Sequence, residues 1–175
     1  REAEARAKME ADIQTRLDQA KAQLAQYESA RALFEAYGSR GWRTHKMTCY
    51  WMPNAARPSF FGQLFDYYYA TGGSYFGAKK ALRPVSAVFD SFATGDRSRG
   101  YARLVNHSTD ALTDVTVTAR IYGADGTQIT RIDSPLLSCG SGSVIDALTL
   151  PRPERKHALF FVRLSVADSE GELLA

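Results

Sequence analysis

The sequence predicts an α+β chain in two parts, with helices around one buried strand first and an antiparallel β-sandwich after it. The first part begins with a stretch that has no Gly or Pro before Gly38 and keeps a helical spacing of apolar residues. From Val85 onward, short alternating runs are separated by turn residues, which is typical of a sandwich. We therefore expect one domain over residues 1–82 and a second over 83–175.

The composition of the chain indicates a folded protein and argues against two other classes. The chain has 175 residues, 22 Lys plus Arg against 19 Asp plus Glu, and a net charge of +3. This small excess argues against a dedicated nucleic-acid binder. Apolar residues make up 45% of the chain, enough for a folded core, but no run approaches the roughly 18 apolar residues of a membrane-spanning helix.

The opening segment predicts one long helix that ends near Gly38. It is rich in Ala, Glu, Gln, Arg and Lys, and a stripe repeats at alternating intervals of four and three residues. We expect a solvated helix with this stripe buried, rather than a coiled coil, because Ala and Arg interrupt the seam. The stripe consists of Ile13, Leu17, Ala20, Leu24, Tyr27, Arg31 and Phe34.

The run from Met47 to Met52 is apolar without alternation, as expected for a strand buried on both faces. Pro58 and Ser59 are expected to open a helix that continues to Tyr68, and a short helical turn should precede Pro84. Trp51 lies at the C-terminal end of the expected strand. In parallel β/α folds ligands bind at that end, so Trp51 is a candidate to stack on a sugar ring.

An immunoglobulin-like module of six or seven strands is expected in the second part, and six of them can be delimited. Between Val115 and Tyr122 apolar and polar residues alternate, so one face should be buried and the other solvated. The residues 124–127 then form a hairpin turn. The expected strands are Val85–Phe89, Tyr101–Asn106, Val115–Tyr122, Gln128–Ile132, Val144–Leu150 and Leu159–Val166.

Neither a metal site nor a cofactor site is predicted. Cys49 and Cys139 lie 90 positions apart without a CxxC or a histidine-rich companion, and the glycine clusters lack the Lys of a phosphate loop. Asn106 begins an N-x-S pattern at a strand end, which makes it a glycosylation candidate in a secreted eukaryotic protein. No signal peptide is visible at Arg1, and we expect the chain to begin in mid-protein. The last residues resemble the start of a further strand, so the sandwich is expected to be truncated.

Four colinear segments resemble family 2 glycoside hydrolases, most closely their exo-β-D-glucosaminidase branch and next the β-mannosidases. The match covers roughly residues 15–170. In that family these segments are the helix before the last barrel strand, the last strand, the last helix, and the linker to an immunoglobulin-like sandwich. They are residues 22–35 (AQLAQYESARALFE), 50–54 (YWMPN), 63–67 (QLFDY) and 73–82 (GSYFGAKKAL).

The resemblance implies that residues 1–82 are the end of a TIM (β/α)8 barrel, followed by an immunoglobulin-like antiparallel β-sandwich. The parent enzyme would cleave β-linked glucosamine or a related β-glycoside from chain ends with retention, using two glutamates. Both glutamates lie on earlier strands in that family, so no catalytic residue is expected here and the chain alone should be inactive. Its partner would be a chitosan-like or β-mannoside-like oligosaccharide, and the family suggests an extracellular or secretory location.

By the same resemblance, Trp51 and Asn54 border the sugar pocket. Relatives carry a second Trp where this chain has Arg57. A guanidinium in place of an indole exchanges stacking for charge, which disfavours a cationic glucosamine and suits an acidic or neutral sugar. Substrate-binding candidates are therefore Trp51, Asn54 and Arg57. The alternatives are a non-catalytic carbohydrate- or protein-interaction module and a pseudoenzyme relic of the glycosidase.

Overall fold

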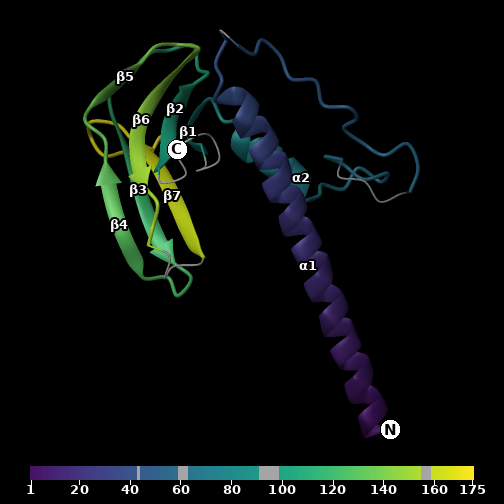
Figure 1. Ribbon diagram of the computed structural model, residues 1–175. Coiled ribbons are helices and arrows are strands. Elements are labelled where there is room, and N and C mark those ends of the chain that lie inside the picture. The colour runs from purple at the N-terminus through teal and green to yellow at the C-terminus, as the bar shows by residue number, and fades with distance from the viewer. Residues whose placement is uncertain (43, 59–62, 91–98, 155–158) are drawn as a thin grey trace. The chain divides into compact units, whose positions relative to one another are not determined.

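The computed structural model describes residues 1–42, 44–58, 63–90, 99–154 and 159–175. The chain forms two compact units, shown in Figure 1. The first unit contains Arg1–Phe34 and Thr48–Leu82, and the second contains Glu35–Met47 and Arg83–Ala175. The segment 35–47 thus belongs with the β-sheets, whereas we expected it in the first domain.

The long helix is confirmed as α1, Glu2–Gly38. Exposed ion pairs between residues three or four positions apart support it, for example Arg6 with Glu10 at 3.3 Å. The expected buried stripe is wrong for most of its length. Only Ala30 and Phe34 are buried in α1, whereas Ile13 and Leu24 are 56% and 61% exposed. Every residue of α1 before residue 22 is exposed.

The expected buried strand at residues 47–52 does not form. Met47 is 82% exposed and Trp51 is 88% exposed. A strand buried on both faces needs parallel neighbours, and near this segment the described residues supply only an isolated parallel bridge between Asn54 and Phe65. Without such partners the apolar run stays irregular.

The expected helix after Pro58 is also wrong within residues 63–70, while residues 59–62 lie outside the described part of the chain. The carboxylate of Asp66 accepts hydrogen bonds from the amides of Tyr68 and Ala70, both at 2.8 Å. Such a side chain offers the backbone an alternative to helical hydrogen bonds. A turn results, in which Tyr69 has a φ of 63°.

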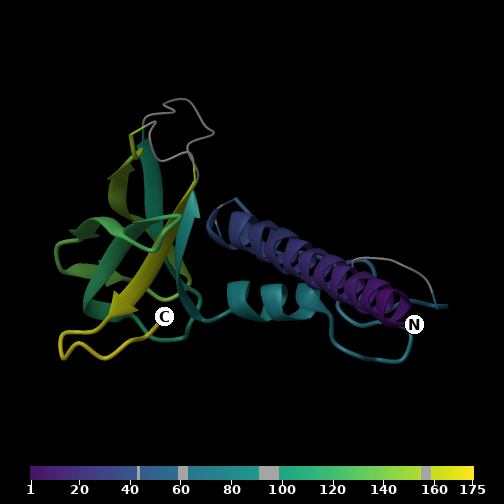
Figure 2. The same cartoon turned by 90° about the horizontal axis from the view of Figure 1, so that it is seen from below.

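Helix α2, Gly73–Ala81, confirms the short helix expected before Pro84. Gly72 stands at its N-cap, and Ser74, Gly77 and Ala78 are buried. Figures 1 and 2 show α2 alongside the C-terminal half of α1.

In the described residues, the second unit contains two antiparallel sheets with seven strands. One sheet has the order β1-β2-β6, with β1 at Val85–Asp90, β2 at Arg99–Asn106 and β6 at Ser143–Pro151. In the other, β3 (Leu112–Gly123) pairs with β7 (Phe160–Ala167) on one side and with β4 (Gln128–Asp133) and β5 (Leu137–Cys139) on the other. All six expected strands are confirmed, and β5 was missed because it has only three residues.

The core of this unit lies between the two sheets. The alternation expected in β3 is confirmed, because Val115, Val117, Ala119 and Ile121 are at most 1% exposed. They pack with Leu104 of β2 and with residues of β6 and β7 in one apolar cluster. The expected turn at 124–127 closes the β3–β4 hairpin, with Gly126 at a φ of 83°. Because alternate residues of β3 are buried in this core, the residues between them point to the opposite face of the sheet.

The chain turns back at its C-terminal end. Gly171 has a φ of 85°, and Leu174 donates its amide to the carbonyl of Val166 at 2.8 Å. Residues 172–175 thereby extend β7 by a short antiparallel return. No helix in the described ranges is both long and apolar enough to cross a membrane.

Candidate functional site

Two glycines set the geometry of the first unit. A Cβ built on Gly73 would lie 2.0 Å from the carbonyl oxygen of Gln23, and one on Gly77 would lie 2.2 Å from that of Tyr27. Both pairs are four residues apart, so each helix presents one face to the other. Only glycine permits such a close approach of two backbones. The segment 73–82, which carries the resemblance to the glycosidase linker, is therefore built to lie directly on α1.

Polar groups add to this contact. The side-chain oxygen of Gln23 accepts a hydrogen bond from the amide of Gly73 at 2.6 Å. Ser74 is 1% exposed, and its hydroxyl donates to the carbonyl of Gln63. These bonds satisfy an amide at the start of α2 and a buried hydroxyl, which would otherwise be destabilising. They also tie the loop before α2 to the helix pair.

The loop that carries the predicted site is attached to this helix pair through Phe65. The amide of Phe65 donates to the carbonyl of Pro53 at 2.8 Å, and Phe65 bridges Asn54 in parallel and Thr71 in antiparallel register. The ring of Phe65 lies 5.3 Å from that of Tyr75 on α2. The segment 50–54 is thereby held on one side by α2, and on the other Tyr50 contacts Phe34 of α1 with 5.8 Å between the rings.

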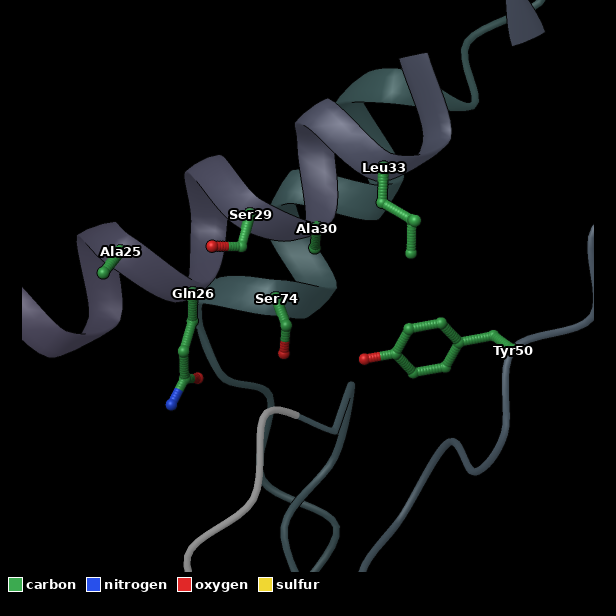
Figure 3. Close-up of a pocket in the computed structure, with 7 residues that line it drawn as sticks. All are labelled: Ala25, Gln26, Ser29, Ala30, Leu33, Tyr50 and Ser74. Atoms are coloured by element: carbon green, nitrogen blue, oxygen red, sulfur yellow. The ribbon is translucent and has the colours of Figure 1, made fainter. Parts of the chain in front are cut away.

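A cavity of about 320 Å³ lies between α1, α2 and Tyr50. Figure 3 shows Tyr50 entering it with its hydroxyl turned toward Ser74. The lining is mainly apolar, and its polar groups are hydroxyls and one amide, so it can pack or bind, but no His, Cys, Lys, Asp or Glu among the lining residues is placed to activate a hydroxyl. The lining residues are Ala25, Gln26, Ser29, Ala30, Leu33, Tyr50 and Ser74.

The three predicted sugar-binding residues lie on one loop but do not converge in this structure. Trp51 is 88% exposed, Asn54 is half-buried through its backbone bridge, and Arg57 is exposed. Within the described chain, none of the three side chains makes a hydrogen bond or an ion pair. The loop therefore exposes the indole of Trp51 and the guanidinium of Arg57 to solvent.

Several acidic side chains of the first unit take part in local structure. Glu28 pairs with Arg31 at 2.9 Å, Glu10 pairs with Arg6, and Asp66 holds its turn. In the parts of the chain that the structure describes, no group of three or more His, Cys, Asp or Glu side chains could hold a metal ion.

Asn106 has a structural role that conflicts with its predicted glycosylation. It is fully buried, and its amide nitrogen donates to the carbonyls of Asp110 at 2.8 Å and of Cys139 and Gly140 at 3.1 Å. Its oxygen accepts from the amide of Ser108 at 3.0 Å. A glycan on this nitrogen would break these bonds, so the folded domain offers no acceptor here. The sequence pattern is correct, but it gives no information about burial.

The sequence analysis did not predict the glycine pair of α2, in which Gly73 is the first residue of the helix. The spacing Gly73-x-x-x-Gly77 could have revealed the contact, because glycines four residues apart mark a helix face that another backbone can approach.

Comparisons with known proteins identify relatives of this chain. No family model matches the chain. The exo-β-D-glucosaminidase of Streptomyces avermitilis is 38% identical over 157 residues, which are 87% of this chain and 17% of the relative. That of Amycolatopsis orientalis is 34% identical over 87% of this chain and 14% of its own length.

A solved structure agrees with the sequence matches. The Amycolatopsis orientalis exo-chitosanase superposes on 89% of this chain and 18% of its own, with a TM-score of 0.74 and 30% identity. The chain is a homologue of family 2 glycoside hydrolases. The β-D-mannosidase of Dictyoglomus thermophilum, with a TM-score of 0.70 and 15% identity over 87% of this chain, shares the fold.

The relatives in this hydrolase family are much longer than the chain. The chain spans about one sixth of the length of the glucosaminidases that it matches. The family is one of glycosidases, which act on glycosyl bonds, and the relatives are exo-acting on glucosamine by name.

Proposed function

We propose that this chain is the C-terminal part of the catalytic barrel of a family 2 glycosidase, joined to its immunoglobulin-like sandwich. The proposed division is residues 1–82 for the barrel and 83–175 for the sandwich. The 38% identity over 157 residues carries this proposal, together with the superposition on the exo-chitosanase. The exposed stripe of α1 and the irregular run 47–52 fit it, because both would gain partners from the remaining strands and helices of a barrel.

The complete enzyme would hydrolyse β-linked glucosamine or a related β-glycoside from chain ends, with retention. Retention requires two carboxyl groups about 5 to 5.5 Å apart. Glu10 and Glu28 form ion pairs and Asp66 closes a turn, which fits the placement of both carboxyl groups outside this chain. The chain alone would therefore be inactive, and it would close the barrel and support it with the sandwich.

Trp51 and Asn54 would form part of the sugar-pocket wall. The exposed indole of Trp51 supports this role, because a ring held on a short tethered loop can stack on a sugar face. Arg57 would sit where relatives place a second indole. Its charge favours an acidic or neutral sugar over a cationic glucosamine, because like charges repel at short range.

A chimera tests this proposal. The Streptomyces avermitilis glucosaminidase would carry this chain in place of its matched segment, and p-nitrophenyl β-D-glucosaminide and β-D-mannoside would be assayed. We expect hydrolysis by the chimera and none by the 175-residue chain alone. Trp51→Ala should lower kcat/KM by about tenfold, an effect of about 1.4 kcal/mol on the transition state.

Trp42→Ala provides the matched control, because Trp42 is also exposed, at 55%, but lies in the second unit against Gly142. Arg57→Trp should shift the preference toward the glucosaminide. A folded chimera in which Trp51→Ala and Trp42→Ala behave alike would contradict the assignment of Trp51.

A non-catalytic interaction module is the second candidate. One observation favours it: the side chains of Trp51 and Arg57 are exposed and make no hydrogen bond or ion pair within the described residues. A chimera that folds but hydrolyses neither glycoside would support this alternative.

A further inference from the structure

Three arginines form a row across the outer face of the second sheet. Arg120 of β3 is directly opposite Arg131 of β4 on one side and Arg163 of β7 on the other. Directly opposite residues of antiparallel strands share a face, with Cβ atoms about 4.5 to 5.5 Å apart. The neighbours of Arg120 in sequence, Ala119 and Ile121, point into the core, so the arginine row points outward.

One carboxylate near this row offsets only part of its charge. Asp133 accepts hydrogen bonds from Arg131 at 3.0 Å and from Thr118 at 2.6 Å, and it also attracts Arg120 electrostatically. In the part of the chain that the structure describes, Arg120 and Arg163 form no hydrogen bond and no ion pair. Like charges placed directly opposite each other destabilise a sheet. Three guanidinium groups facing one carboxylate leave a net positive charge on this face.

The two rows of residues that flank the arginine row on β3 and β7 differ in chemistry. Tyr122 and Phe161 are paired in register on one side of the arginines, and Phe161 is 57% exposed. Thr118 and Ser165 are paired on the other side. Aromatic rings, guanidinium groups and hydroxyls thus lie in three neighbouring rows on β3 and β7. Figure 1 shows these two strands side by side.

We propose that this face binds an anionic polysaccharide whose sugars carry carboxylates. Guanidinium groups bind carboxylates with paired hydrogen bonds, an aromatic ring stacks on the apolar face of a sugar, and hydroxyls bond to sugar hydroxyls. An acidic peptide would bind the arginine row alone, whereas a chain of uronic acids, with carboxylates, apolar ring faces and hydroxyls, would contact all three rows. The proposal concerns the sandwich only and does not depend on the glycosidase assignment.

Titration calorimetry of the 175-residue chain with oligogalacturonate tests it, with the methyl-esterified oligomer as the neutral control. Esterification removes the charge and keeps the sugar ring. We expect the acidic oligomer to bind at least tenfold more tightly than the ester. Binding should also weaken when salt rises from about 0.01 M to about 1 M, because the Debye length falls from about 30 Å to about 3 Å.

Two variants assign the binding to this face. The double variant Arg120→Gln with Arg163→Gln should weaken binding of oligogalacturonate at least tenfold. The matched control is Arg6→Gln with Arg16→Gln, which removes the same charge from ion-paired positions on α1 and should bind as the unmodified chain does. Phe161→Ser should weaken binding of oligogalacturonate but not of poly-L-glutamate. Thermal melting of each variant confirms that it is folded.

Three results would overturn the proposal. The first is no binding of the acidic oligomer at low salt, and the second is equal loss in the control variant. The third is binding of poly-L-glutamate as tight as that of oligogalacturonate with Phe161→Ser affecting neither, which would assign the face to an acidic protein instead.

Discussion

Gly77 of α2 lies against the backbone of Tyr27 of α1 so closely that a Cβ on Gly77 would be 2.2 Å from the Tyr27 carbonyl oxygen. No flexible side chain can move to relieve this clash, because the atom it meets belongs to the backbone of a helix. The two helices must separate if residue 77 gains a side chain. This contact holds the segments that carry the strongest family resemblance.

Gly77→Ala should therefore destabilise the first unit. We expect a loss of about 1 to 3 kcal/mol, as for other overpacked positions. Hydrogen exchange of the α2 amides would report it, with faster exchange in the variant. Gly38→Ala is the matched control, because a Cβ there would meet only the His107 side chain at 3.5 Å. That change should be neutral or stabilise by about 0.5 to 1 kcal/mol.

Asn106 should be among the most sensitive positions of the sandwich. Asn106→Ala removes the donor that the buried Asn106 amide gives to the carbonyl of Cys139, and a buried group left unsatisfied costs about 1 to 3 kcal/mol. Asn106→Asp keeps the acceptor for Ser108 but removes the donor, so it should also destabilise. Urea denaturation measures both. Asn54→Ala, whose side chain makes no hydrogen bond, should change stability little.

The two cysteines should react at different rates. Cys49 is exposed, whereas Cys139 is buried and burial raises the pKa of its thiol. Since the thiolate is the reactive form, only Cys49 should react with a thiol reagent in the native protein. A reagent that releases a coloured thiol should react rapidly with one cysteine per chain in the native protein and with two per chain after unfolding. Equal rates for both would contradict the burial of Cys139, and Cys49→Ser should abolish the fast reaction.

The pKa of Asp133 should respond to Thr118. Hydrogen bonds from the Thr118 hydroxyl and from Arg131 hold this pKa below its ordinary value of 3.8. Because the folded value is the lower one, the contribution of Asp133 to stability is present above the unfolded pKa. It is lost as pH falls through the folded value. Thr118→Val should raise the pKa of Asp133 in a carboxyl NMR titration, whereas Thr116→Val, one row away, should leave it unchanged.

The sandwich could be predicted from sequence because its information is local. Alternation identified the buried face of β3, and turn residues delimited the strands. The arginine row could not be predicted, because it depends on the register of β4 and β7 against β3, which alternation does not specify. β5 was missed for a different reason, since three residues are too few to show a period.

The first unit was predicted less well because its segments depend on partners. The run at residues 47–52 has the composition of a buried strand, but composition does not supply neighbouring strands. At residues 63–70, the carboxylate of Asp66 competes with the helix, a contact that apolar spacing does not show. The glycines of α2 were visible in sequence, but their role requires knowing that α1 lies against them.

Reading the coding sequence immediately upstream of Arg1 tests the central claim most directly. The account predicts that the reading frame continues through further strand and helix units that carry two glutamates at strand ends. A start codon or an unrelated sequence next to Arg1 would contradict the assignment to a catalytic barrel, and it would leave the chain as an interaction module.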